Sequence, residues 1–233
     1  MENEISDILI GAPYPFTVGR KHYRLYPVTL AKMQIIQRLL DEIAIKKEHL
    51  YLDVNLEMIR IVKEKRRQCS RLLAYYTAPN SYKDLFDFRS LKIRENYFFE
   101  EMKEEDMATI LLFMFTSDKT DTYMKSLGIE SEMKRMQRVM KVKKKDKNSL
   151  SFGGRSIFGS FIAPLKEMGY TDEEILYERG YTYLRLMLAD KIQTIYLSDD
   201  ERKRVPRNAL YGGEVLKASD MRTKELIKNT EWD

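Results

Sequence analysis

The sequence predicts a mainly α-helical protein that combines an N-terminal β-hairpin and helical domain, a flexible linker and a small C-terminal helical domain. Apolar residues recur at helical spacing along most of the chain, two short β-prone runs flank Gly19-Arg20, and a lysine-rich and then glycine-rich stretch interrupts the helical pattern. The 233 residues with 43% hydrophobic content suffice for one large or two small cores. We divide the chain into the hairpin and helical domain (1–140), a basic flexible linker (141–155), a C-terminal helical domain (156–198) and a charged, disordered tail (199–233).

The first element is the hairpin between Tyr14 and Pro27. Glycine at the first central position of a two-residue loop is typical of a type II′ turn, because that position needs a positive φ. Threonine is a preferred residue at the N-cap of a helix, so we expect Thr29 to cap the start of the next helix. The helix that follows has a mostly apolar stripe, formed by Leu30, Met33, Ile36, Gln37, Leu40 and Ile43.

Two further helices complete the predicted N-terminal core. One runs from about Asn55 to Tyr76 and ends before Pro79, since the residue before a proline is disfavoured in a helix. We expect it to form a helical hairpin with the helix after Thr29. The other covers Met107–Phe115, which follows three acidic residues and is apolar on all sides. That composition predicts a buried helix at the centre of the core.

The remaining helices lie on both sides of the linker. A short helix around Thr120 to Leu127 and a basic amphipathic helix at about 131–140 precede it. After it, a short helix ends at Gly169, and Thr171 with Glu174 forms a capping box. A long helix is predicted from Tyr181 to Tyr196. Ser198 can cap one more turn, and the rest of the chain shows little periodicity.

Composition limits the classes of function. No run of residues approaches the roughly 20 apolar positions needed to cross a bilayer, so we expect no membrane span. The acidic N-terminus does not resemble a secretory signal. The net charge of +5 is modest, and only the linker concentrates it, with Lys141, Lys143, Lys144, Lys145 and Lys147. A solvated linker explains these lysines better than a nucleic-acid site, because only one aromatic, Phe152, stands near them and no nucleic-acid-binding motif accompanies them.

The sequence offers no catalytic constellation. His22 and His49 are too few and too far apart to suggest a metal site or a general base. The single cysteine, Cys69, has no histidine partner nearby and is interpreted as structural. The glycines after Phe152 lack the spacing of a phosphate-binding loop. We therefore expect no enzymatic activity, no cofactor and no metal, and we expect the protein to act by binding.

Two segments resemble tailed-bacteriophage tail assembly chaperones. An extended segment, Phe16–Leu25, followed by Pro27-Val28-Thr29-Leu30 and a helix, is similar to the start of those proteins. The stretch Met168–Leu176, continuing to Tyr181–Leu184, is similar to their second portion. The region from about Asn55 to Met140 carries no such resemblance.

The resemblance implies a non-enzymatic chaperone in the cytoplasm of the bacterial host. Members of that family have two parts joined by a flexible segment, sometimes through a programmed ribosomal frameshift. They keep the tape measure protein soluble while tail tube subunits assemble around it, and they are absent from the finished tail. The implied partners are thus the tape measure protein and the tail tube protein, and self-association is left open.

A long helical partner would need an apolar surface on this chain. We place its contacts on the C-terminal helices, around Phe158, Phe161, Tyr181 and Tyr183. The lysines of the linker, or the tail, would recruit a second partner. Two alternatives remain open: a phage virion structural or adaptor protein with permanent helical contacts, and a nucleic-acid-binding regulator that uses the lysine-rich linker.

Overall fold

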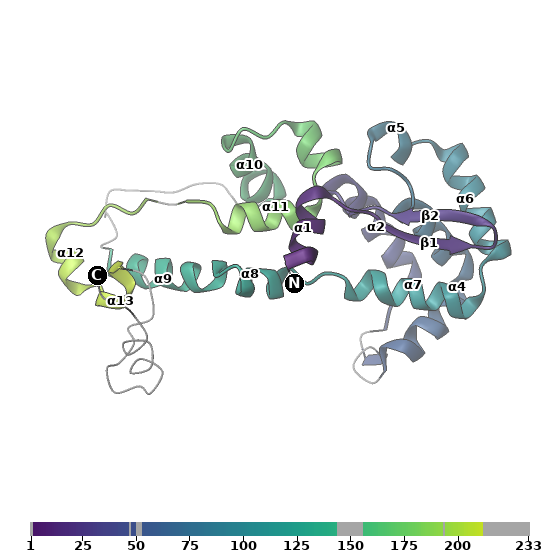
Figure 1. Cartoon of the computed structure of the whole chain (residues 1–233), viewed down its shortest axis with the longest axis horizontal. Helices are drawn as coiled ribbons and strands as arrows, with labels where there is room; N and C mark the ends of the chain where they lie inside the picture. The colour runs from purple at the N-terminus through teal and green to yellow at the C-terminus, as the bar shows by residue number, and fades with distance from the viewer. Residues whose placement is uncertain (1, 47, 50–52, 144–155, 193, 212–233) are drawn as a thin grey trace, which may run out of the picture. The chain divides into compact units, whose positions relative to one another are not determined.

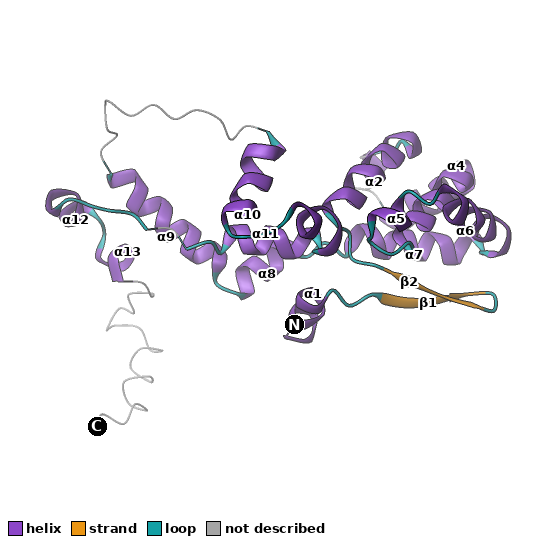
Figure 2. Cartoon of the chain, turned by 90° about the horizontal axis from the view of Figure 1, so that it is seen from above, coloured by secondary structure: helices purple, strands orange, loops and turns teal. Residues whose placement is uncertain are grey.

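The computed structural model describes residues 2–46, 48–49, 53–143, 156–192 and 194–211. It confirms a mainly α-helical chain with a two-stranded antiparallel hairpin near the N-terminus (Figures 1 and 2). The described residues fall into two compact units, and each is considered by itself.

The first unit comprises residues 2–124 and 156–191. Its elements are α1 (Glu2–Ile10), β1 (Tyr14–Val18), β2 (Lys21–Leu25), α2 (Leu30–Ile43), α4 (Val54–Tyr76), α5 (Tyr82–Leu85), α6 (Phe88–Glu101), α7 (Glu104–Thr116), most of α8 (Thr120–Ser126), η1 (Phe158–Ile162), α10 (Ala163–Glu167), η2 (Glu174–Glu178) and α11 (Tyr181–Ala189). The second unit contains α9 (Ile129–Val142), α12 (Asp199–Arg204) and α13 (Arg207–Tyr211).

The hairpin has the predicted two-residue turn. Val18 pairs with Lys21, and Gly19 has a φ of 57° while Arg20 does not have a positive φ, as in a type II′ turn. The inner face of the hairpin packs on α6, where the ring centroid of Tyr23 lies 4.7 Å from that of Phe98. Gly19 also sits close to α6, because a Cβ at this position would lie 3.0 Å from the hydroxyl oxygen of Tyr97.

The helix α2 begins where the sequence predicts. The Thr29 hydroxyl accepts a hydrogen bond from the backbone N–H of Lys32, which satisfies one free donor of the first turn. The apolar side of α2 is buried at Ile36, Leu39 and Ile43 and packs against α4. The predicted pairing of these two helices is therefore confirmed.

The centre of the main core is α4 rather than α7, so the expectation of a central helix at Met107–Phe115 was wrong. α4 packs against α2, α6 and α7, and its Val62, Leu72 and Leu73 are fully buried. α7 instead buries one face, including Met107 and Leu111, while Phe113 remains 40% exposed. A helix with neighbours on one side leaves even apolar residues uncovered on the other.

Two buried carboxylates tie α4 to its neighbours. Glu57 accepts hydrogen bonds from the backbone N–H of Lys46 and from Arg60, and it lies 2.9 Å from His49 Nδ1. The Arg60 guanidinium is the main reason that the pKa of Glu57 falls to about 2. Glu95 of α6 is paired with Arg67 and with two further cations, Arg71 and Lys92. The hydrogen bonds and cations around each carboxylate thus offset the free-energy cost of removing its charge from water.

The helices that follow the linker pack onto α2, which differs from the predicted separate domain at 156–198. The backbone N–H of Tyr181 donates to the carbonyl of Val28 over 2.7 Å, and Thr29 forms an antiparallel bridge with Gly180. A second apolar cluster then forms from Leu30, Leu165, Ile175 and Leu184. Apolar residues of α2 thus take part in two separate clusters. The helices after the linker pack on one of these clusters and do not form a separate core.

The capping box predicted at Thr171 and Glu174 is confirmed. The long helix predicted from Tyr181 to Tyr196, in contrast, is shorter than expected. Thr171 and Glu174 exchange hydrogen bonds between side chain and backbone. α11 ends at Ala189 rather than at Tyr196. Ile192 and Tyr196 are 93% and 81% exposed, and without packing a further helical turn gains little stability.

The second unit corrects the prediction of a disordered tail for residues 199–211. Ser198 and Glu201 form a full capping box at α12, whose first turn is acidic and last turn basic, as the helix dipole favours. Arg135 of α9 donates from Nε to the carbonyl of Ala209 over 2.9 Å. Residues 212–233 lie outside the described residues, as do 144–155 of the predicted linker.

In the described part of the chain, no helix is both long enough and apolar enough to cross a membrane.

Candidate functional site

The four residues that we expected to contact a partner differ in their surroundings. Phe158, in η1, is 71% exposed. Phe161 and Tyr181 are half-buried, with ring centroids 5.3 Å apart. The Tyr183 hydroxyl lies 3.2 Å from that of Tyr170 and forms a hydrogen bond with it. The last three therefore help to pack the second apolar cluster, and Phe158 is the one of the four that is mostly open to solvent.

The lysines of the predicted linker divide between two regions. Lys141 lies in the last turn of α9, where a cation interacts favourably with the helix dipole, and Lys143 follows directly after the helix. Lys144, Lys145 and Lys147 lie outside the described residues.

An aromatic patch on the first unit was not predicted as a site. We use this name for Tyr82, Phe86, Phe88 and Tyr177, which come from α5, the α5–α6 connection, α6 and η2. Tyr82 and Phe88 are 62% and 66% exposed, and Phe86 is 43% exposed. The Tyr82 ring centroid lies 4.8 Å from that of Phe86 and 5.8 Å from that of Tyr177.

Part of this patch could have been predicted from the sequence. Tyr82 and Phe86 are four positions apart, the spacing at which side chains meet on one helix face. Tyr177 follows much later in the chain and joins them because η2 packs on α2. A tertiary contact of that kind has no local sequence pattern.

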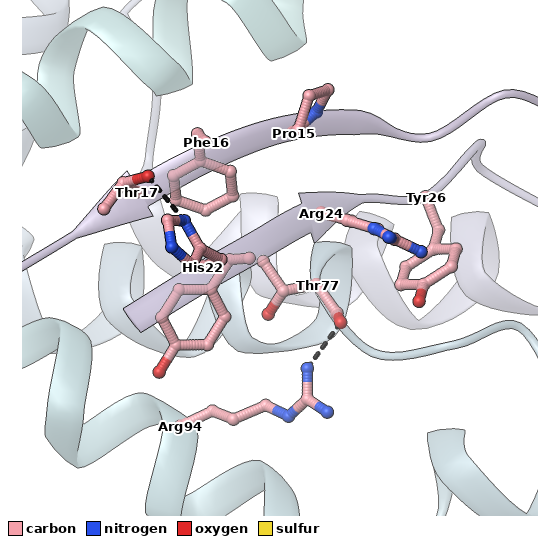
Figure 3. Close-up of a pocket in the computed structure, with 9 residues that line it drawn as sticks. Pro15, Phe16, Thr17, His22, Arg24, Tyr26, Thr77 and Arg94 are labelled. Atoms are coloured by element: carbon pink, nitrogen blue, oxygen red, sulfur yellow. Dashed lines mark hydrogen bonds between the residues drawn. The ribbon is translucent and has the colours of Figure 1, made fainter. Parts of the chain in front are cut away.

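A pocket of about 700 Å³ opens beside the hairpin (Figure 3). It is lined by Pro15, Phe16, Thr17, His22, Tyr23, Arg24, Tyr26, Thr77 and Arg94. These nine residues include two arginines and a histidine but no aspartate or glutamate. The pocket is therefore basic.

Each wall of the pocket follows from the local fold. The strand register places Thr17 opposite His22, and the Thr17 hydroxyl lies 3.1 Å from His22 Nδ1 (Figure 3). Thr77 is the C-cap of α4, and its carbonyl accepts a hydrogen bond from Arg94 of α6. Burial raises the pKa of Tyr23 above its ordinary value of 10.0.

A fully buried lysine lies close to this pocket. Lys32 of α2 donates from Nζ to the carbonyl of Ala78 over 2.8 Å, and its Nζ is 5.6 Å from the centroid of the Tyr26 ring. Burial, together with repulsion from Arg94, lowers the pKa of Lys32 from 10.5 to about 7. Asp84 opposes that shift only in part.

The depressed pKa of Lys32 predicts a stability that rises with pH. Between pH 7 and about 10 the unfolded chain holds a proton on this lysine that the folded chain has released, so unfolding takes up a proton. We expect the free energy of unfolding to increase by about 1 to 2 kcal/mol from pH 7 to pH 8.5. The Lys32→Met variant should lose this increase, as measured by urea denaturation at both values.

The exposed Lys63 on the neighbouring α4 supplies the control for that measurement. Lys63→Met should keep the pH dependence of the native chain. If the Lys32→Met chain gained as much unfolding free energy between pH 7 and pH 8.5 as the native chain, groups other than Lys32 would cause the pH dependence.

The described residues offer neither a reactive thiol nor a cluster of metal ligands. Cys69 is fully buried in the main core, and burial raises the pKa of its thiol to about 12, so the thiolate is not formed at neutral pH. Among the described residues, no three histidine, cysteine, aspartate or glutamate side chains gather as a metal site would require.

Comparisons of this chain with protein-family models, with curated proteins and with solved structures return no match.

Proposed function

We propose that this protein is a non-enzymatic tail assembly chaperone of a tailed bacteriophage, which binds the tape measure protein in the host cytoplasm and helps to recruit tail tube subunits. The observation that most supports this proposal is that the two segments that carry the resemblance pack against each other. The segment that begins with the hairpin and the segment Met168–Leu184 meet through the Thr29–Gly180 bridge and the cluster around Leu30. Two similarities far apart in the sequence thus belong to one folded body.

The exposed aromatic side chains suit the capture of a helical partner. Tyr82, Phe88 and Phe158 are each more than 60% exposed, although burying such rings is strongly favourable. An amphipathic helix presents apolar residues at positions i, i+3, i+4 and i+7, which rings of this size can cover. We place the tape measure contact on the aromatic patch and on Phe158. Phe161, Tyr181 and Tyr183 support it from within the second cluster.

The test is co-expression with the tape measure protein of the same phage. The native chain should increase the soluble fraction of the tape measure protein and co-purify with it. The double variant Tyr82→Ser and Phe88→Ser should reduce the recovered complex by about tenfold or more, since loss of 1.4 kcal/mol of binding free energy corresponds to a factor of ten.

The matched control replaces two leucines that are equally exposed elsewhere on the first unit. Leu9 and Leu56 are 58% and 65% exposed, so Leu9→Ser with Leu56→Ser removes two apolar side chains of similar fractional exposure. This control should bind like the native chain. Failure of the native chain to bind the tape measure protein would contradict the proposed function, and equal loss in both double variants would contradict the proposed contact.

Mass spectrometry of purified phage particles separates a chaperone from a virion protein. A chaperone is released before the tail is complete, so the chain should be missing from particles. Its presence at a fixed copy number would favour a structural or adaptor role.

A further inference from the structure

The basic pocket beside the hairpin has cationic donors that the fold leaves largely unused. Arg94 has five N–H donors, and its hydrogen bond to the Thr77 carbonyl uses one of them. Arg24 lines the same pocket, and within the described part of the chain no hydrogen bond or ion pair engages its guanidinium. Both groups can therefore donate to a further oxygen acceptor.

No carboxylate lining the pocket balances this charge. His22 adds a third basic side chain, and its ring approaches the Thr17 hydroxyl. The Nζ atom of Lys32 lies 5.6 Å from the centroid of the Tyr26 ring, and it adds positive potential when it is protonated. Like charges that share one concave surface repel each other, so an anion bound among them would be stabilised.

The other walls of the pocket are aromatic. Phe16, Tyr23 and Tyr26 line it together with Pro15, and the ring centroids of Phe16 and Tyr23 are 5.8 Å apart. The volume of about 700 Å³ falls in the range typical of small-molecule sites. An arginine guanidinium matches the planar geometry of a carboxylate and also binds phosphate through paired hydrogen bonds.

We propose that this pocket binds an oxyanion, a carboxylate or a phosphate, that is carried on an aromatic or apolar body. The anionic group pairs with Arg24 and Arg94, and the apolar body lies against the rings of Phe16, Tyr23 and Tyr26. This site is separate from the aromatic patch and does not depend on the proposed chaperone function.

The test is an NMR titration of the full-length, isotope-labelled chain with four probes at constant ionic strength. The probes are phenyl phosphate, benzoate, inorganic phosphate and the neutral benzyl alcohol. We expect saturable shifts of amide signals in residues 14–26 and around Thr77 and Arg94. Phenyl phosphate or benzoate should bind at least about tenfold more tightly than benzyl alcohol, because a charge-assisted hydrogen bond is worth more than about 1.4 kcal/mol. The tighter of the two anions identifies the preferred oxyanion.

Arg24→Gln is the decisive variant, because Arg24 is exposed and its side chain makes no hydrogen bond or ion pair with the described residues, while its backbone pairs with Pro15 in the hairpin. It should weaken binding of the preferred anion by about tenfold. Arg38→Gln, which removes an exposed arginine of α2 outside the pocket, should leave binding unchanged. Arg94→Gln should also weaken binding, but it removes the hydrogen bond to Thr77 as well, so the Arg24 variant carries the test.

Three results would overturn the proposal. Benzyl alcohol that binds as tightly as the anions would show that the aromatic walls act alone. Equal loss in the Arg24 and Arg38 variants would assign the effect to the overall charge of the protein. Shifts that grow linearly with concentration, or that spread over the whole unit, would show the absence of a defined site.

Discussion

Replacing Phe98 with alanine should destabilise the protein by about 3 to 5 kcal/mol, the largest effect that we expect from a single substitution. Phe98 is fully buried in the main core, on the face of α6 that supports the hairpin. Its ring centroid lies 4.7 Å from that of Tyr23 and 6.4 Å from that of Phe16. Removal of the ring leaves a cavity and also deprives both strands of their support. Urea denaturation at neutral pH measures the change.

The adjacent Phe99 provides a matched control. It is 36% exposed, and the guanidinium carbons of Arg66 and Arg67 lie 5.6 Å and 4.9 Å from its ring centroid. Phe99→Ala therefore loses partly hydrated contacts and should cost about 1 kcal/mol. Equal costs for the two variants would contradict the assignment of the core to α4, α6 and the hairpin.

Replacing Leu184 with alanine should cost about 2 to 5 kcal/mol and should act mainly on the helices that follow the linker. Leu184 is fully buried among Leu30, Leu165 and Ile175. The main core around α4 is a separate cluster, so it can persist when the second cluster is weakened. Hydrogen exchange should speed up across residues 156–191 while the amides of α4 stay protected.

Leu186 of the same helix is only half-buried and lies outside this cluster, so Leu186→Ala should change exchange in residues 156–191 very little. If the Leu184→Ala chain instead loses protection equally in α4 and in residues 156–191, the first unit unfolds as one body and the separation of its clusters is wrong.

Local chemistry explains which elements the sequence could predict. The hairpin turn depends on Gly19, the start of α2 on the Thr29 hydroxyl, and the box at Thr171 on a glutamate three positions later. Each of these signals is complete within about four residues, so it is visible without knowledge of the tertiary fold.

The features that the sequence missed depend on contacts between distant segments. The central position of α4 follows from three helices packing around it, and the early end of α11 goes with the exposure of Ile192 and Tyr196 beyond it. The aromatic patch and the basic pocket likewise combine residues from separate elements. The predicted contact residues Phe161, Tyr181 and Tyr183 each lie three or four positions before another apolar residue, a helical spacing that fits a core as well as it fits a surface.

The bridge between Thr29 and Gly180 also affects how the chain folds as it is made. The two partners are about 150 positions apart, so at 5 to 20 residues per second the ribosome needs about 8 to 30 s to supply the second after the first. The main core can form in that interval, because all of its buried residues precede position 115. Leu30 cannot be covered by Leu165, Ile175 and Leu184 until they have been synthesised. The nascent chain therefore carries a bare apolar face on α2 that only the last part of the first unit can close.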